Sequence, residues 1–421
     1  MSIQTVAVIG LGYVGLPTAA ILANRGVDVL GVDVNVKTVE RINRGQVHIV
    51  EPDLDIMVRG AVQAGKLRAA TTPEAADAFI IAVPTPFKGI HTPDLSYIEQ
   101  AAASIAPALK KGDLVVIEST CPVGTAEKVS GWLADARADL SFPRTGTDAP
   151  DVSVAHSPER VLPGRVLIEM VQNDRIVGGL TERCTRRAMD LYGLFVSGSI
   201  MPTDATTAEL VKLAENAYRD VNIAFANELS RVSDTLGLNV WDVIDLANHH
   251  PRVDILNPGP GVGGHCIAVD PWFIVDSAPD VTPLIQAARG VNDAKPLAVV
   301  DAALKALDET GAKAIACLGL SYKADIDDLR ESPAVDIVTL LAEKAEAAVL
   351  VVEPHVEVLP GALAAADGVR LCDMETALGD AGVVLLLTDH REFRAIDPDA
   401  LAAKRVIDTR GIWRNSSGKN V

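Results

Sequence analysis

The chain has 421 residues, of which 48% are hydrophobic and 22% are charged, and this composition predicts a folded protein of two or three domains. Its net charge is −18 and no stretch forms a basic tail or stripe, which argues against binding to nucleic acid. Its five cysteines lie far apart, with neither a Cys-x-x-Cys pair nor a cluster at metal-ligand spacing, so we expect no disulfide framework and no metal site. The absence of a signal peptide and of any apolar run of roughly 18 residues predicts a cytoplasmic protein that does not enter a membrane.

The first predicted element is a strand in the apolar run that starts at Thr5, and it leads into a glycine-rich turn, Gly10-Leu-Gly-Tyr-Val-Gly15. A helix is expected next, and a second strand over residues 27–33 ends in Asp33. This context is typical of a dinucleotide-binding unit, in which a helix N-terminus and close backbone approach hold the pyrophosphate. Asp33 would accept a hydrogen bond from a ribose 2′-hydroxyl and repel a 2′-phosphate, which favours NAD over NADP, although the nearby Lys37 could weaken that preference. The alternative is that the glycines serve only a strand–helix turn.

Strands and helices continue to alternate, with buried strands predicted over residues 78–83 and 113–118. Thr85 follows the first of these strands, and Thr120 and Thr125 follow the second. Because ligands of such sheets bind at the carboxyl ends of the strands, these threonines are candidate ligand contacts, with helix caps or turn residues as the alternative. A further strand over residues 152–156 leads into a loop, Ser157-Pro-Glu159-Arg160, that carries an acid and a base together.

The middle of the chain is predicted to hold a long helix over residues 207–236, capped by Asp204 or Thr206. Lys212 and Asn216 are four residues apart and therefore share one helix face. That pairing suits a polar site, and a solvated lysine is the alternative.

A second feature of the middle is the segment Asn257–Pro271, which packs four glycines and three prolines around Cys266, with Asp270 four residues later. Glycine lets a backbone come close to a ligand, and proline stiffens the approach. A cysteine in such a loop is predicted to be a nucleophile, and the alternative is the small buried hydrophobe that a cysteine without a disulfide usually is.

The last third repeats the strand-and-helix pattern, with strands predicted over residues 313–320, 348–354, 382–387 and 405–409. It suggests a second nucleotide-binding layer whose cations, Lys323, Arg330 and Arg410, could pair with phosphates. Surface ion pairs with Asp325, Asp327 and Asp328 are the alternative. The predicted fold is therefore α/β, with two Rossmann-like doubly wound domains, residues 1–203 and 309–421, joined by a long central helix in a helical middle domain, residues 204–308.

Six motifs occur in a fixed order along nearly the whole chain. They are Gly10-Leu-Gly-Tyr-Val-Gly15, Val83-Pro-Thr-Pro86, Glu118-Ser-Thr120, Glu209-Leu-Val-Lys-Leu-Ala-Glu-Asn216, Gly263-Gly-His-Cys-Ile-Ala-Val-Asp270 and Asp328-Leu-Arg-Glu-Ser-Pro333. In kind and order they resemble the UDP-glucose/GDP-mannose dehydrogenase family. The resemblance implies a four-electron oxidation of a sugar C6 alcohol to a carboxylate with two NAD⁺, in which Cys266 forms a thiohemiacetal and then a thioester that water cleaves.

The resemblance also implies roles for individual residues. It implies a homodimer formed through the central helix, in which Arg252 could serve the active site of the partner. The implied catalytic residues are Cys266, Lys212, Asn216, Asp270, Glu159 and Thr120. The implied cofactor-binding residues are Gly10, Gly12, Tyr13, Val14, Gly15, Asp33, Thr85, Thr125 and Arg330. The implied sugar-nucleotide contacts are Arg160, Val161, Lys212, Asn216, Arg219, His250, Arg252, Gly263, Tyr322, Lys323 and Arg410.

Within the family, the text around Arg160 and Cys266 is similar to that of members acting on UDP-N-acetyl-D-mannosamine, and UDP-glucose or UDP-N-acetylglucosamine is the alternative substrate. Two other classes of function are alternatives. An epimerase that keeps its NAD would leave Cys266 without a task and needs a Tyr-x-x-x-Lys pair that the first domain lacks. A non-catalytic nucleotide-sugar sensor would predict loss of Cys266 or Lys212, and both are present.

Overall fold

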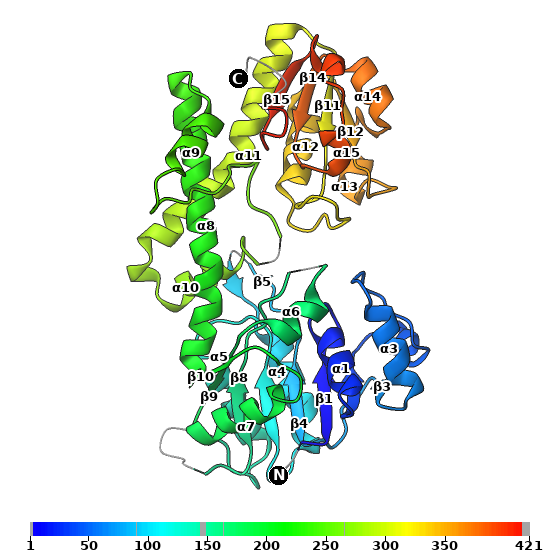
Figure 1. Ribbon diagram of the computed structural model, residues 1–421, viewed down its shortest axis with the longest axis vertical. Helices are drawn as coiled ribbons and strands as arrows, with labels where there is room; N and C mark the ends of the chain where they lie inside the picture. The colour runs from blue at the N-terminus through cyan, green and yellow to red at the C-terminus, as the bar shows by residue number, and fades with distance from the viewer. Residues whose placement is uncertain (1–2, 90, 144–148, 163, 265, 415–421) are drawn as a thin grey trace. The chain divides into compact units, whose positions relative to one another are not determined.

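The chain divides into two compact units in the computed structural model, which describes residues 3–89, 91–143, 149–162, 164–264 and 266–414 (Figure 1). The first unit comprises Met1–Glu215 and Trp272–Pro279, and the second comprises Asn216–Pro271 and Asp280–Val421. Each unit has its own sheet, and each is described by itself.

The first unit is built on a sheet with the strand order β10-β9-β8-β7-β4-β1-β2-β3 among the described residues. Its pairs are parallel except for β8 with β9. The central strands are short runs of valine, isoleucine and other apolar residues that are buried on both faces, as is usual when helices cover both sides of a parallel sheet. The strands are β1 (Thr5–Ile9), β2 (Asp28–Val32), β3 (Leu67–Ala70), β4 (Ala78–Ile81), β7 (Leu114–Ile117), β8 (Ser153–His156), β9 (Arg175–Gly179) and β10 (Ile200–Asp204).

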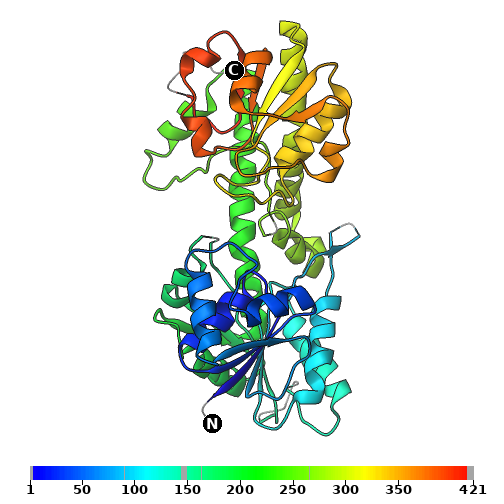
Figure 2. The same ribbon diagram turned by 90° about the vertical axis from the view of Figure 1, so that its right-hand side faces the viewer.

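Helices cover both faces of this sheet (Figure 2). One face packs against α1 (Gly15–Asn24), α2 (Val36–Asn43), α3 (Leu54–Gln63), α6 (Val166–Gln172) and α7 (Glu182–Tyr192). The other face packs against α4 (Ser96–Ile105) and α5 (Thr125–Ala136). A short antiparallel pair, β5 (Phe87–Lys88) and β6 (Thr92–Pro93), follows β4.

The long central helix is α8 (Ala205–Leu236). Of the two predicted caps, Asp204 is the one used, because its carboxylate accepts from the Thr207 amide at 2.8 Å and from the Thr207 hydroxyl at 2.6 Å. The chain continues through α9 (Val240–Ala247), α10 (Asp270–Ser277) and α11 (Pro283–Thr310). In the second unit α8 and α11 are joined by buried polar contacts, among them the Arg289–Asp220 ion pair at 2.5 Å.

The second unit contains a wholly parallel sheet with the order β13-β12-β11-β14-β15 in the part of the chain that the structure describes. Its strands are β11 (Ala314–Leu318), β12 (Ala348–Val352), β13 (Val369–Leu371), β14 (Val383–Leu386) and β15 (Arg405–Asp408). One face packs against α11, α12 (Pro333–Lys344) and α13 (Gly361–Ala364), and the other against α14 (Met374–Asp380), α15 (Arg391–Arg394) and α16 (Pro398–Leu401). The predicted α/β class with two Rossmann-like sheets and a helical middle is thus confirmed.

Several elements were not predicted from the sequence, among them β3, β9, β10, α7 and α10. Strand β10 is an edge strand that contains Pro202 and is partly exposed, so it lacks the apolar run that marks a buried strand. No helix among the described residues combines the length and apolarity that a membrane crossing requires.

Candidate active site

The glycine-rich turn joins β1 to α1 in the first unit, as predicted. Gly10 has φ +93°, and a Cβ there would lie 2.5 Å from the Ala82 carbonyl oxygen. A Cβ at Gly15 would lie 1.9 Å from the Gly10 carbonyl oxygen, so no larger residue fits either position without moving the backbone. A Cβ at Gly12 would meet nothing within 4 Å. The turn is therefore closed on its protein side and open at Gly12, next to the exposed Tyr13, which fits a cofactor pyrophosphate approaching the backbone.

Asp33 lies at the end of β2 against this turn. Its Oδ2 accepts from the Leu11 amide at 3.1 Å, and its Oδ1 accepts from the Asn35 amide at 2.8 Å. The carboxylate is half-buried and its remaining lone pairs can accept from a ribose hydroxyl. The turn and the acceptor oxygens of Asp33 therefore fit an NAD cofactor.

The ends of β4 and β7 carry the three predicted threonines. The Thr85 hydroxyl donates to the Thr120 carbonyl oxygen at 2.6 Å, so the structure brings these two residues together. Thr125 is buried, and its hydroxyl donates to the Pro122 carbonyl oxygen at 2.6 Å. The sequence allowed either cofactor contact or a local turn role for Thr125, and in the structure its hydroxyl has the local turn role.

The N-terminus of α5 is capped by a residue that sequence reasoning missed. Glu209 of α8 is buried, and its two carboxylate oxygens accept from the Gly124 amide at 2.6 Å and from the Ala126 amide at 2.7 Å. Burial raises the pKa of the Glu209 carboxyl to about 7, against the lowering effect of those backbone bonds. Lys212, the predicted oxyanion-stabilising residue, is half-buried one turn further along the same helix.

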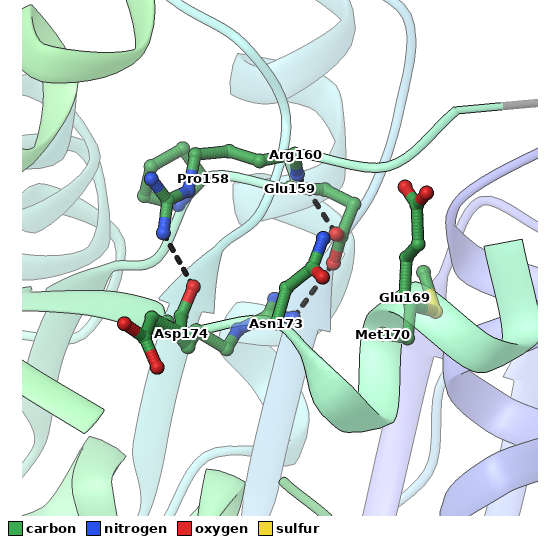
Figure 3. A pocket seen from close by; sticks show the side chains of 8 residues that line it. Pro158, Glu159, Arg160, Glu169, Met170, Asn173 and Asp174 are labelled. Atoms are coloured by element: carbon green, nitrogen blue, oxygen red, sulfur yellow. Dashed lines mark hydrogen bonds and ion pairs between the residues drawn. The ribbon is translucent and has the colours of Figure 1, made fainter. Parts of the chain in front are cut away.

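The Glu159–Arg160 loop follows β8 and borders a small cavity (Figure 3). The Glu159 carboxylate accepts from the Arg160 amide at 2.8 Å and pairs with Arg175 at 2.7 Å. The Arg160 guanidinium pairs with Glu215 at 2.8 Å and donates to the Asp174 carbonyl oxygen. The cavity measures about 10 Å³, close to the space that one water molecule needs. Its lining consists of Pro158, Glu159, Arg160, Glu169, Met170, Asn173, Asp174 and Arg175.

A buried charged network lies behind Glu159. Arg175 also pairs with Glu118 at 2.7 Å, and Glu118 accepts from the Tyr192 hydroxyl at 2.8 Å. Burial raises the pKa of the Glu118 carboxyl, while Arg175 opposes the rise. Burial and the nearby Arg175 charge together lower the pKa of His156 to about 3, so this histidine is neutral at physiological pH. The sequence indicated no role for Arg175 or Tyr192, because Glu118, which both of them contact, is far from each along the chain.

Cys266 belongs to the second unit, where its side chain is exposed and therefore is not core filler. The glycines before it are required by close packing, because a Cβ at Gly263 would lie 2.5 Å from the Glu331 carbonyl oxygen and 2.8 Å from the Tyr322 Cβ. Gly264 has φ +84° and a Cβ there would lie 2.9 Å from the Tyr322 ring. The structure thus brings the predicted Gly263 and Tyr322 together.

Asn216 and Asp270 are also joined in the second unit. Asn216 Nδ2 donates to Asp270 Oδ2 at 2.5 Å, and both side chains are buried. The Asp270 amide donates to the Cys266 carbonyl oxygen at 2.9 Å. A fixed amide–carboxylate pair therefore lies within one backbone turn of the exposed thiol.

The predicted cations of the second unit differ in their surroundings. Arg330 forms a two-pronged ion pair with Asp328, at 2.8 and 2.6 Å, which is the surface pairing that the sequence left open. Arg410 donates through Nε to the Leu387 carbonyl oxygen at 3.0 Å, and its Nη1 would lie 3.1 Å from a Cβ at Gly259. Lys323 is exposed. The other predicted sugar-nucleotide contacts are the half-buried Val161 of the first unit and the exposed Arg219, His250 and Arg252 of the second unit.

The turn that carries Tyr322 and Lys323 has a support of its own. Glu353, at the end of β12, accepts from the Leu320 amide at 2.7 Å and the Ser321 amide at 3.1 Å. The buried His390 lies 3.1 Å from the same Glu353 oxygen and accepts from the Asp325 amide at 2.9 Å. Two buried side chains therefore hold both ends of this turn.

Family models match the chain over nearly its whole length. All three describe the UDP-glucose/GDP-mannose dehydrogenase family: its NAD binding domain over residues 4–196, its central domain over residues 206–294 and its UDP binding domain over residues 316–415.

Curated proteins of similar sequence are full-length matches. The NDP-N-acetyl-D-galactosaminuronic acid dehydrogenase of Ralstonia nicotianae is 60% identical over 97% of this chain and 96% of its own length. The UDP-N-acetyl-D-mannosamine dehydrogenase of Yersinia pestis is 57% identical, and that of Escherichia coli is 53% identical, each over 98% of this chain and 100% of its own.

Solved structures agree with these matches. The UDP-D-ManNAc dehydrogenase from Pyrococcus horikoshii is 39% identical, covers 97% of this chain and 96% of its own, and has a TM-score of 0.87. The UDP-N-acetyl-mannosamine dehydrogenase from Staphylococcus aureus is 42% identical, covers 99% of this chain and 96% of its own, and has a TM-score of 0.85.

Proposed function

Because the chain belongs to the UDP-glucose/GDP-mannose dehydrogenase family and is an NAD-dependent UDP-sugar dehydrogenase, we propose that it oxidises UDP-N-acetyl-D-mannosamine at C6 to the uronate. The observation that carries the chemistry is the exposed Cys266, held in a glycine loop beside the buried Asn216–Asp270 pair. A simple alcohol dehydrogenase needs no thiol, whereas an oxidation that continues to the carboxylate does.

The two oxidations require Cys266 in between. The Gly10–Gly15 turn would hold NAD⁺, which would supply the hydride acceptor, one NAD⁺ for each oxidation. The first oxidation leaves an aldehyde, which is a poor hydride donor, and addition of the Cys266 thiolate converts it to a thiohemiacetal. Loss of the second hydride gives a thioester, and water then releases the acid and returns the thiolate.

The other proposed catalytic residues act on charge and protons. Lys212 stabilises the alkoxide and the tetrahedral oxyanion. The Asn216 amide and the Asp270 carboxylate, fixed against each other, orient the reacting oxygen and assist proton transfer. Glu159 and Thr120 handle the water that cleaves the thioester.

The sugar identity rests on the relatives and has one specific competitor. Mannosamine dehydrogenases match at 53–57% identity, which supports UDP-N-acetyl-D-mannosamine. The Ralstonia relative at 60% is named for N-acetyl-D-galactosaminuronic acid, so a nucleotide of N-acetyl-D-galactosamine is the second candidate substrate.

The test is NADH formation with UDP-N-acetylmannosamine, UDP-N-acetylgalactosamine, UDP-N-acetylglucosamine and UDP-glucose offered separately, with the yield per sugar counted at completion. We expect about two NADH per sugar with the first substrate. Two per sugar with another sugar would keep the mechanism and overturn the assignment of substrate, and one or none would overturn the thioester step.

The thiol has a matched control in the same unit. Cys266→Ala is expected to abolish uronate formation, whereas Cys372→Ser, at a half-buried cysteine beside β13, should leave it intact. Loss of activity in both variants would point to instability rather than to chemistry.

We also propose that a second copy of the chain covers one face of α8. Tyr218, Phe225 and Val232 are 69%, 55% and 46% exposed, and their seven-residue spacing places them on one face of the helix, as in helix pairs that associate through such a stripe. Phe225→Glu is expected to shift the mass in solution from dimer to monomer in light scattering. Asp234→Asn should not, because Asp234 is exposed and its spacing from Phe225 places it on the opposite face of the same helix. A wild-type monomer at micromolar concentration would overturn the proposal.

A further inference from the structure

Arg175 is the buried cation that connects two carboxyl groups in the first unit. It begins β9 and its side chain is 6% exposed. Its Nη1 donates to Glu159 Oε2 at 2.7 Å, its Nη2 donates to Glu118 Oε1 at 2.7 Å, and its Nε donates to the Ser157 hydroxyl at 2.9 Å. The guanidinium also lies 4.0 Å from the centre of the Tyr192 ring. Each nitrogen of the fork is therefore engaged, which fixes the plane of the guanidinium.

The charges of this network do not balance if both carboxyl groups are ionised. One guanidinium faces Glu118, whose side chain is 0% exposed, and Glu159, whose side chain is 8% exposed. Glu118 is enclosed further by the Tyr192 hydroxyl and by Thr18 of α1 at 3.1 Å. Burying a second unbalanced negative charge is unfavourable, and burial raises the pKa of Glu118. Glu118 is thus the more enclosed of the two carboxyl groups, and Arg175 bridges it to Glu159.

Glu159 is held on the side that faces the cavity. One of its oxygens is bound by Arg175 and the other by the Arg160 amide. The water-sized cavity of about 10 Å³ is lined by Glu159 and by Arg160 (Figure 3). A carboxylate oxygen has two lone pairs, so each oxygen can accept a further hydrogen bond. The carboxyl group of Glu159 is therefore fixed in direction and lies beside room for a water molecule.

We propose that Arg175 is a positioning residue, which holds the Glu159 carboxylate in the orientation needed to accept a proton from the water that cleaves the Cys266 thioester. In that step the water oxygen bonds to the thioester carbon, its proton passes to Glu159, and the carbon–sulfur bond breaks to return the Cys266 thiolate. This inference rests on the function proposed above and assigns the residue that supports its hydrolytic half.

The test compares Arg175→Lys with a matched substitution. Lysine keeps the positive charge but loses the fork that binds Glu159 and Glu118 together. Arg137→Lys is the control, because Arg137 also forms an ion pair at 2.7 Å, with Asp139, in the same unit. General bases contribute about 10²–10⁴-fold to rate, so a misdirected base should lose roughly 10–100-fold. We expect kcat to fall by that factor in Arg175→Lys while KM stays within about twofold, since Arg175 itself does not touch the substrate.

The decisive readout is the covalent intermediate. In Arg175→Lys the acyl adduct on Cys266 should accumulate and be visible by intact mass after an acid quench, as it should in Glu159→Gln, whereas Arg137→Lys should show neither change. The double variant Arg175→Lys/Glu159→Gln should be no slower than Glu159→Gln alone, because both substitutions disable one function. Losses that multiply, or a slow enzyme without adduct, would overturn the proposal.

Two further measurements keep the outcomes separate. If Arg175→Lys lacks the wild-type circular dichroism spectrum, Ser157→Ala replaces it as a milder variant that loosens only the Nε contact, and a smaller accumulation of the same adduct is expected. The wild-type yield of NADH per sugar is measured first. A yield of one would refute the proposed function before Arg175 is tested, whereas a yield of two with no adduct in any variant would refute this inference alone.

Discussion

Replacing Glu209 by glutamine tests whether burial or backbone hydrogen bonding controls this carboxyl group. Glu209 is 1% exposed and holds the Gly124 and Ala126 amides at the N-terminus of α5. Two backbone donors and the helix dipole favour the ionised form, and burial favours the neutral form. In the structure burial prevails, and the pKa of the carboxyl is raised from 4.5 to about 7.

The sign and size of the effect follow from that shift. A folded-state pKa above the unfolded value means that the folded chain binds the proton more tightly, so this stabilisation is fully present below pH 4.5 and is lost as the pH rises to about 7. At about 1.4 kcal/mol per unit, the change is about 3 kcal/mol. Glutamine cannot titrate, so the variant escapes this loss. Between pH 5 and pH 8, the thermal midpoint of the wild type should therefore drop by roughly 5–10 °C relative to that of the variant, for a unit of this size.

The assay is thermal unfolding of the full chain, followed by circular dichroism at several pH values, for the wild type, Glu209→Gln and Glu127→Gln. Glu127 is an exposed acid in the first turn of α5, the helix that Glu209 caps. Its replacement removes a charge without changing a buried group. A difference between wild type and Glu209→Gln that stays flat across the pH range would refute the reasoning, because it would mean that the amide bonds and the dipole outweigh burial.

Three other substitutions have defined outcomes. Gly15→Ala places a Cβ 1.9 Å from the Gly10 carbonyl oxygen, and it should weaken NADH binding at least about tenfold in a fluorescence titration, because about 1.4 kcal/mol of strain already has that effect. Asp33→Ala should raise the KM for NAD and narrow its advantage over NADP, and an unchanged ratio of kcat/KM for the two cofactors would contradict the role of the carboxylate. Arg289→Met leaves Asp220 buried without its ion-pair partner and should cost about 3–5 kcal/mol in thermal or urea unfolding. Adding Asp220→Asn should restore part of that loss, and no recovery would mean that packing rather than charge is responsible.

The elements that could be predicted from the sequence are those specified by residues close together along the chain. The apolar runs of β1 and β4 are explained by burial on both faces, and Gly15 is explained by its contact with Gly10, five residues earlier. Asp33 lies at a fixed distance along the same strand–helix–strand unit, so its place against the turn could be predicted as well. The 32-residue helix α8 was recognisable for the same reason.

Contacts between distant segments could not be predicted in this way. Arg175 meets Glu118 across 57 residues, and Glu209 meets Gly124 across 85 residues. Nothing in the residues beside Arg175 distinguishes it from an arginine on the surface, because its burial is created by the packing of β8, β9 and α7.

The two acids that follow β2 and β12 occupy matching places in the two sheets but differ in burial and in their hydrogen-bond partners. Asp33 is half-buried and keeps lone pairs toward solvent, whereas Glu353 is 5% exposed and is consumed by the Leu320 and Ser321 amides and by His390. An engineer who wished to make the second sheet accept a dinucleotide would therefore gain nothing by keeping this acid, since its charge already serves the interior. The same sheet architecture thus serves an NAD binding domain in one unit and a UDP binding domain in the other, and the acid at this position faces outward in the first and inward in the second.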